Sequence, residues 1–307
     1  MTTLSEHGTG QTRGVRLLRK AISESAKWGL VSLKWLPAAQ RADAVDILLG
    51  NPGVVDRPHG EIRFLNHNRR SYWRARTIMT KEPDSMSWID AMQPGSVFWD
   101  IGANVGVLAL YAAMRGDLEV WAFEPAAVNY YNLIANCELN GLEKPVRCLQ
   151  LGFGDTLGIL DLNVSQLKPA HATAPRKVFS SAQSVQVCNI DDFIIRYGAP
   201  CPNYIKIDVP GLTHEIFAGA RRTPAQPVLK EIQVEAREHG AGRRIAELLA
   251  PFGFTIVKRA MRYGGTTFQR ISSSLAIPAR RPQASPSLVE PLHPSEDFRA
   301  ARKRLAG

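Results

Sequence analysis

Between residues 97 and 235 the sequence alternates short apolar runs with amphipathic stretches, and this alternation is the strongest constraint on the fold. Such apolar runs are typical of strands buried on both faces of a parallel sheet, and the stretches between them of covering helices. We predict strands at 97–99, 120–123, 146–151, 185–190, 204–209 and 232–235. We predict helices at 105–115, 126–140, 191–197 and 214–222. The predicted fold class is α/β, with a doubly wound and mostly parallel sheet.

Two further strands are predicted after this region. Residues 242–260 have the pattern of a helix, a turn and a strand, and residues 266–273 (TTFQRISS) follow as a hairpin partner. We therefore expect the last strand to run antiparallel to the others and to close the sheet at one edge.

The flanking regions differ in composition from the central part. Apolar and basic residues at helical spacing in 15–36 predict an accessory helix, and weak contact with a membrane surface is the alternative interpretation. A turn-rich break at 51–60, a strand at 61–67 and a helical stretch at 68–92, interrupted at Pro83, are predicted next. From residue 272 onward the chain is rich in Pro, Ser and Arg, which predicts disorder. We expect an accessory region at 1–80, a main domain at 81–271 and a tail at 272–307.

The net charge of +10 is carried by the flanks. Residues 1–95 and 236–307 carry net charges of +5 and +8, whereas residues 96–235 carry −3. Enzymes that act on nucleic acids surround their site with positive potential, so this distribution disfavours a specific nucleic-acid substrate. The four cysteines lack the spacing of a zinc site or a disulfide framework, and no apolar run is long enough to span a bilayer. We therefore expect a cytoplasmic protein without a metal.

A glycine-containing turn joins the first predicted strand to its helix in the segment VFWDIGANVGVLALYAA, residues 97–113. Its spacing, Gly102-x-x-x-Gly106 with Asn104 between, departs from the G-x-G-x-x-G fingerprint of dinucleotide sites. Asp100, at the end of the strand, would repel a diphosphate by roughly a few kcal/mol and would attract an ammonium group. S-Adenosylmethionine (SAM) carries an α-ammonium and a sulfonium group and has no phosphate. The turn therefore favours SAM over a nicotinamide cofactor.

A second acid, Glu124, ends the next predicted strand, 18 residues after Gly106. In nucleoside-binding α/β folds an acid at this place binds the ribose hydroxyls, at a spacing of about 20 residues. The two acids would therefore bracket a ligand made of adenosine and an amino acid. The alternative is that Asp100 caps a helix and Glu124 is a solvated loop residue.

Five segments in order resemble the motifs of FkbM-type SAM-dependent methyltransferases: VFWDIGANVGVLALYAA, VWAFEPAAVNYYNLIANCELNGL, SVQVCNIDDFI, YIKIDVPG and EIQVEA. The resemblance runs from about residue 81 to residue 235. It implies a Rossmann-like fold and O-methylation of a hydroxyl on a sugar, a glycan or a small metabolite. The residues assigned to the cofactor site are Asp100, Gly102, Asn104, Gly106 and Glu124, with Asp155 and, in a Lys-Glu-Pro segment, Glu82 as further candidates.

The resemblance defines the catalytic group less well. Asp208 matches the acid of the family's K-I-D strand and is our first candidate for the general base, although it could instead orient the cofactor or cap a turn. The family usually has two further acids on the next loop, where this chain has Pro210 and Thr213. His214 stands beside this loop and is the second candidate base. Further alternatives are His171 and Asp155.

Two other classes of function stay open. The loss of the two loop acids is compatible with a protein that keeps the SAM pocket and serves as a non-catalytic binding or partner subunit. RNA methylation would fit the positive charge, but the sequence lacks an N-P-P-Y-like amine-flipping motif and a recognisable RNA-binding module.

Removal of residues 272–307 should leave the melting temperature nearly unchanged, because this segment has little apolar surface to bury. Thermal unfolding of the truncated and full-length chains, followed by circular dichroism, measures the difference. A cooperative loss of structure in the truncated chain would contradict the predicted disorder.

Overall fold

The computed structural model describes residues 53–65, 77, 82–163, 182–209, 211–235, 241–259 and 265–271. All of them belong to one compact unit, Pro52–Gly307. The predicted helix at 15–36 and the predicted tail at 272–307 lie outside the described residues, as do His171 and Pro210. The division of the chain at residues 80 and 271 stays a prediction.

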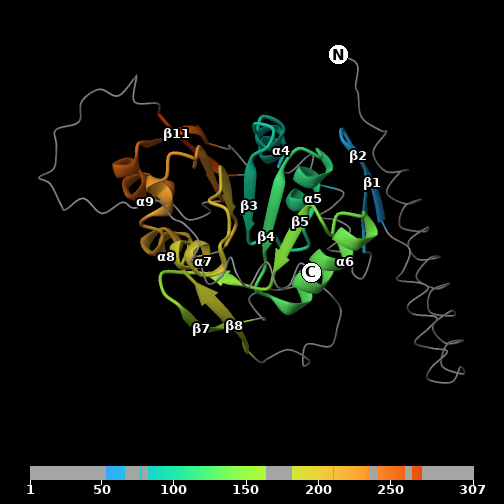
Figure 1. Ribbon diagram of the computed structural model, residues 1–307, viewed down its shortest axis with the longest axis horizontal. Coiled ribbons are helices and arrows are strands. Elements are labelled where there is room, and N and C mark those ends of the chain that lie inside the picture. The colour runs from blue at the N-terminus through green and yellow to red at the C-terminus, as the bar shows by residue number, and fades with distance from the viewer. Residues whose placement is uncertain are drawn as a thin grey trace, which may run out of the picture. The chain divides into compact units, whose positions relative to one another are not determined.

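A seven-stranded sheet forms the centre of the unit (Figure 1). Its strands are β3 (Val97–Ile101), β4 (Glu119–Phe123), β5 (Val146–Leu149), β9 (Tyr204–Ile207), β10 (Glu231–Val234), β11 (Phe254–Arg259) and β12 (Thr266–Arg270). The strand order is β11-β12-β10-β9-β3-β4-β5. The pairs from β10 to β5 are parallel, and β12 is antiparallel to both of its neighbours. The predicted doubly wound, mostly parallel sheet is confirmed.

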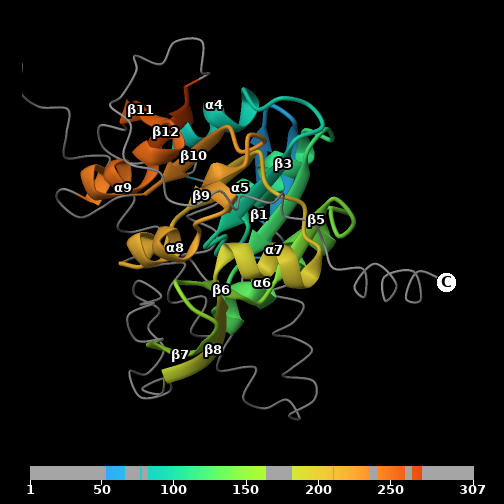
Figure 2. The same cartoon turned by 60° about the vertical axis from the view of Figure 1, so that its left-hand side comes forward.

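Helices cover both faces of this sheet (Figures 1 and 2). One face carries α4 (Pro83–Asp90), α5 (Val107–Met114) and α6 (Ala127–Leu139), and the other carries α7 (Ile190–Tyr197), α8 (Thr213–Gly219) and α9 (Ala241–Leu249). Two short 3-10 helices, Thr223–Ala225 and Ala250–Phe252, follow α8 and α9. Within the part of the chain that the structure describes, no helix is both long and apolar enough to cross a membrane.

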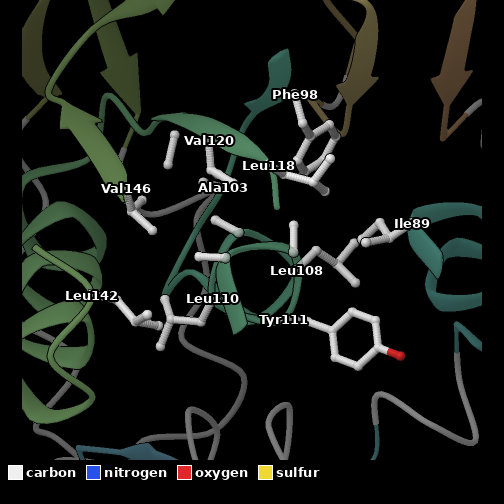
Figure 3. Packing of buried hydrophobic residues seen from close by; sticks show 14 of the residues in the cluster. Ile89, Phe98, Ala103, Leu108, Leu110, Tyr111, Leu118, Val120, Leu142 and Val146 are labelled. Atoms are coloured by element: carbon white, nitrogen blue, oxygen red, sulfur yellow. The ribbon is translucent and has the colours of Figure 1, made fainter. Parts of the chain in front are cut away.

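The first core lies around α5, whose sequence VLALYAAM is apolar on all sides apart from one hydroxyl. Six of its eight residues are buried, because the helix packs between the sheet and α4. Figure 3 shows Leu108 and Leu110 of α5 with Ile89 of α4 and Val120 of β4 around them. An all-round apolar helix of this kind is stable only inside a core.

The second core lies on the opposite face and is rich in aromatic residues. Trp99, Phe123, Phe153 and Phe193 form edge and tilted ring pairs with centroids 4.8–5.6 Å apart. Such pairs bury large apolar areas in defined geometries. Because Trp99 and Phe123 belong to β3 and β4, this core holds the two strands that carry the glycine turn and Glu124.

The predicted strand at 185–190 is real but belongs to another sheet, which corrects the expectation that it joins the parallel sheet. A three-stranded sheet is formed by β6 (Gly152–Phe153), β8 (Ala182–Cys188) and β7 (Gly158–Asn163). The long antiparallel pairing with β7, which the sequence did not indicate, takes β8 away from the main sheet. The predicted strand at 146–151 accordingly ends at Leu149.

The last strand, β12, is antiparallel to its neighbours as predicted, but it lies one position inside the sheet, between β10 and β11, and β11 forms the edge. The predicted turn-rich break at 51–60 also needs correction, because it contains β1 (Gly53–Arg57), which pairs with β2 (Gly60–Phe64). The expected interruption at Pro83 agrees with the described residues: Glu82 is not helical, and Pro83 begins α4, since proline is well tolerated at a first helical position.

Candidate active site at the ends of β3, β4 and β9

The carboxyl ends of β3 and β9 lie side by side at the point where the order of strands along the chain reverses. From β3 the chain builds β4 and β5 on one side, and it then returns to build β9 and β10 on the other. The crevice beyond such a switch point is the usual ligand site of open α/β sheets. Residues just after β3, β4 and β9 are therefore the natural candidates for a site.

The glycine turn after β3 is shaped by its neighbours in the fold. Gly102, Asn104 and Gly106 have φ angles of 82°, 56° and 87°, which only glycine and a few polar residues adopt readily. A Cβ atom on Gly102 would overlap the carbonyl oxygen of Asp208. One on Gly106 would lie 2.5 Å from the side chain of Leu133. Backbone packing thus requires glycine at position 102, where the sequence predicts close approach by a ligand, and the positive φ angle favours glycine at position 106.

Glu124 ties β4 to this turn. The N–H of Asn104 donates to its Oε2 and the N–H of Ala126 to its Oε1, each at 2.9 Å. Burial raises the pKa of Glu124, and these two N–H groups oppose the rise. The Asn129 amide also donates to Oε1, at 3.4 Å. Since a carboxylate offers about four lone-pair sites, the group retains capacity to accept a further hydrogen bond from a hydroxyl.

Asp100 forms a buried ion pair with Lys206 of β9. The two residues are 1% and 6% exposed and are register partners on adjacent strands, with Nζ 3.4 Å from Oδ1. Burial raises the pKa of Asp100, and the ammonium of Lys206 opposes that rise. The alternative that Asp100 is a helix cap does not match its place within β3.

Lys206 is also close to three other carboxylates. Burial by itself would lower its pKa, but Asp100, Asp208, Glu82 and Glu235 together raise it. Four carboxylates therefore act on one buried ammonium. Carboxylates at a strand end suit a ligand that brings positive charge.

Two of these carboxylates belong to sequence-predicted site residues at element boundaries. Asp208 directly follows β9 and is half-buried. Glu82 is the N-cap residue of α4, where Oε2 accepts a hydrogen bond from the Ser85 hydroxyl at 3.3 Å. The structure thus brings Glu82, Asp100 and Asp208 together around Lys206.

Asp155 and His214 lie in a different setting. Both are exposed, whereas the charged cluster around Lys206 is buried or half-buried. Asp155 follows β6 and accepts a hydrogen bond from the Thr156 hydroxyl at 3.3 Å. His214 lies in the first turn of α8, and Thr213 begins that helix.

Two members of the cluster, Lys206 and Glu235, are not among the residues predicted from the sequence. For Lys206 a signal exists, since a basic residue inside an otherwise apolar strand needs a charged partner once it is buried. The adjacent strand β3 contains one acid, Asp100. Glu235 follows β10 in the same way that Asp208 follows β9.

The carboxylates of this cluster are not arranged as a metal site. Among the described residues, no group of three or more His, Cys, Asp or Glu side chains could hold a metal ion.

The strand order, the glycine turn and the acids at the strand ends define a class, the Rossmann-like methyltransferases. A family model described as the methyltransferase FkbM domain matches residues 100–256, about half of the chain. The chain belongs to this family and is a methyltransferase. Family membership also indicates SAM as the cofactor, as the sequence predicted.

The curated relatives are distant. The hexuronic acid methyltransferase AglP of Haloferax volcanii is 23% identical over 170 residues, which cover 55% of this chain and 68% of the relative. The 31-O-demethyl-FK506 methyltransferase FkbM of Streptomyces tacrolimicus is 24% identical over 213 residues, which cover 59% and 82%.

Solved structures with a similar fold are more distant still. The B. subtilis tRNA methyltransferase TrmK is 13% identical with a TM-score of 0.40, covering 62% of this chain and 66% of that one. The ribosomal protein L11 methylase of Lactobacillus delbrueckii subsp. bulgaricus is 16% identical with a TM-score of 0.39, covering 61% and 76%. Likeness at this level carries no conclusion about what the chain binds.

Gly102→Ala should lower the free energy of unfolding by at least about 2 kcal/mol, because the new Cβ meets the Asp208 carbonyl at a positive φ. Gly116→Ala is the matched control, since Gly116 has φ +77° and open space around its Cα. Gly116→Ala should lower the free energy of unfolding by about 1 kcal/mol, because only the positive φ angle is unfavourable there. Chemical denaturation of both variants tests this, and equal losses would contradict the packing role of Gly102.

Proposed function

We propose that this protein transfers a methyl group from SAM to a hydroxyl oxygen of a sugar, a glycan or a small metabolite. The observation that carries the proposal is the pair of buried carboxylates at adjacent strand ends, Asp100 and Glu124. Carboxylates suit an ammonium group and a ribose diol, and they would repel the diphosphate of a dinucleotide. The names of two relatives, a hexuronic acid methyltransferase and a 31-O-demethyl-FK506 methyltransferase, support the choice of a hydroxyl acceptor.

The residues present fit SAM as follows. Glu124 would accept the ribose hydroxyls, and the turn formed by Gly102, Asn104 and Gly106 would pass beside the amino-acid part. Asp100 and Glu82 would supply the negative charge that the α-ammonium requires. We retain Asp155 as a candidate for the adenine end, because it is an exposed acid just after β6. The fit rests on charge and on the places of these groups at the strand ends.

Bound SAM supplies an activated methyl group and a neutral thioether as leaving group. The protein must then hold the acceptor oxygen in line with the methyl carbon and take the hydroxyl proton as charge develops. Asp208 is our candidate for that base, since it is a half-buried carboxylate at the switch point. His214 is the second candidate because it stands one residue after Thr213, at the start of α8.

Glu124→Ala should weaken SAM binding by about 1.5–3 kcal/mol, roughly 10- to 150-fold in Kd, because the ribose hydroxyls lose a charged acceptor in a buried site. Isothermal calorimetry with SAM and with its demethylated product measures this. If the unchanged protein bound a nicotinamide cofactor tightly and SAM not at all, the proposed function would be wrong.

The control for this variant is Asp191→Ala. Asp191 is likewise buried and accepts hydrogen bonds from the N–H groups of Arg221, Arg222 and Thr223. Both variants leave buried N–H groups without their acceptor and should lower the melting temperature. Only Glu124→Ala should change the affinity for SAM.

Asp208→Asn should lower turnover at least about 100-fold while SAM affinity stays within a few-fold, because the variant cannot accept the hydroxyl proton. Methyl transfer from labelled SAM to a panel of uronic acids, glycans and polyketide alcohols is the measurement. A large loss of turnover in His214→Ala, together with a small loss in Asp208→Asn, would instead identify His214 as the base.

The same screen separates catalysis from binding alone. A protein that binds SAM and methylates none of these acceptors would favour the non-catalytic partner subunit. Thr213, which stands where the family usually has an acid, is the feature that would then account for the lost activity.

A further inference from the structure

A row of polar side chains crosses the sheet behind the site. Asp100 on β3, Lys206 on β9, Gln233 on β10 and Thr267 on β12 are successive register partners, and each is at most 6% exposed. In the neighbouring register row, on the other face, the residues of β3, β9 and β10 are apolar: Ile101, Ile207 and Val234. The row is therefore confined to the sheet face that also carries α4.

The charged members of this row are costly for the fold. Removing two charges from water is offset only by good mutual geometry, and apolar residues of similar size often pack at least as stably. At 3.4 Å, the contact between Lys206 and Asp100 is longer than a strong charge-assisted hydrogen bond. Stability alone therefore does not explain why a lysine stands here.

Lys206 is tied to the glycine turn through both strands. It is the register partner of Asp100, which precedes Gly102 by two residues. Asp208 follows Lys206 by two residues, just after β9, and its carbonyl packs against Gly102. The charges of both acids act on the Lys206 ammonium.

We propose that Lys206 is a positioning residue that keeps Asp100 ionised, so that Asp100 can bind the α-ammonium of SAM. This inference rests on the proposed function. Burial and the nearby carboxylates would otherwise favour a protonated Asp100, and a neutral carboxyl group binds an ammonium poorly. Those carboxylates are Asp208, Glu82 of α4 and Glu124 after β4; Glu235 after β10 faces the lysine.

Loss of the lysine has two opposite consequences. In Lys206→Met, Asp100 takes up a proton at a higher pH than in the unchanged protein. As the pH rises and this proton leaves, the ligand-free fold loses stability, because an acid whose folded pKa lies above its unfolded pKa destabilises the fold once it is ionised. Over the same range the affinity for an ammonium ligand increases.

The probe is S-adenosylhomocysteine, which carries the same α-ammonium and cannot react. Calorimetry between about pH 5.5 and 7.5 should show its affinity for Lys206→Met rising at least about tenfold, against less than about threefold for the unchanged protein. The melting temperature of the ligand-free variant should fall over the same range. Lys206→Arg should restore the flatter binding profile.

Gln233→Met is the matched control, since it removes an uncharged polar member of the same buried row. For this variant, the affinity for S-adenosylhomocysteine and the melting temperature should change with pH in parallel with those of the unchanged protein. A Lys206→Met profile that is also parallel would overturn the proposal and leave the lysine a packing role.

A double variant keeps the test decisive if Lys206→Met does not fold. Asp100→Asn with Lys206→Met removes both charges and should fold, because replacing a complete buried pair is often tolerated. It should bind S-adenosylhomocysteine at least about tenfold more weakly at every pH, and unchanged affinity would overturn the proposal. If the unchanged protein bound neither SAM nor S-adenosylhomocysteine, the proposed function would fail instead.

Discussion

The whole structure depends on the contact between the ends of β3 and β9. There the backbone of Gly102 passes so close to the carbonyl of Asp208 that only a residue without a side chain fits. The two strands also join the two halves of the doubly wound sheet, so their register decides which side chains meet at the switch point. Asp100 lies beside Lys206 because of that register, and the charged cluster follows from it.

The two faces of the sheet serve different ends. The face under α7, α8 and α9 is apolar and holds the aromatic rings of Trp99, Phe123 and Phe193, which supply packing in defined geometries. The face under α4 and α5 is apolar around α5 but carries charges toward β9 and β10. Burying charges lowers the stability of the fold, and apolar packing on the opposite face can offset this cost.

Much of the candidate site could be predicted because its residues lie in or just after the last positions of strands. Asp100, Glu124 and Asp208 were assigned from their places at the ends of apolar runs, and carboxyl ends of parallel strands lie at one edge of a sheet. Lys206 and Glu235 were not assigned, because their importance comes from partners on other strands. The exposed setting of Asp155 and His214 could not be read from the sequence, since exposure depends on what packs nearby.

The sequence by itself determined the strands and helices of the main sheet, where the glycine turn lies and which acids stand at the ends of the apolar runs. These properties depend on local periodicity and on the φ angles that glycine allows, and both are encoded within a few residues. Only the tertiary structure decided that β8 leaves the main sheet for β7, that β12 lies between β10 and β11, and that one lysine stands among four carboxylates. Strand partners and register are chosen by side-chain packing between segments far apart in the chain, so no local pattern specifies them.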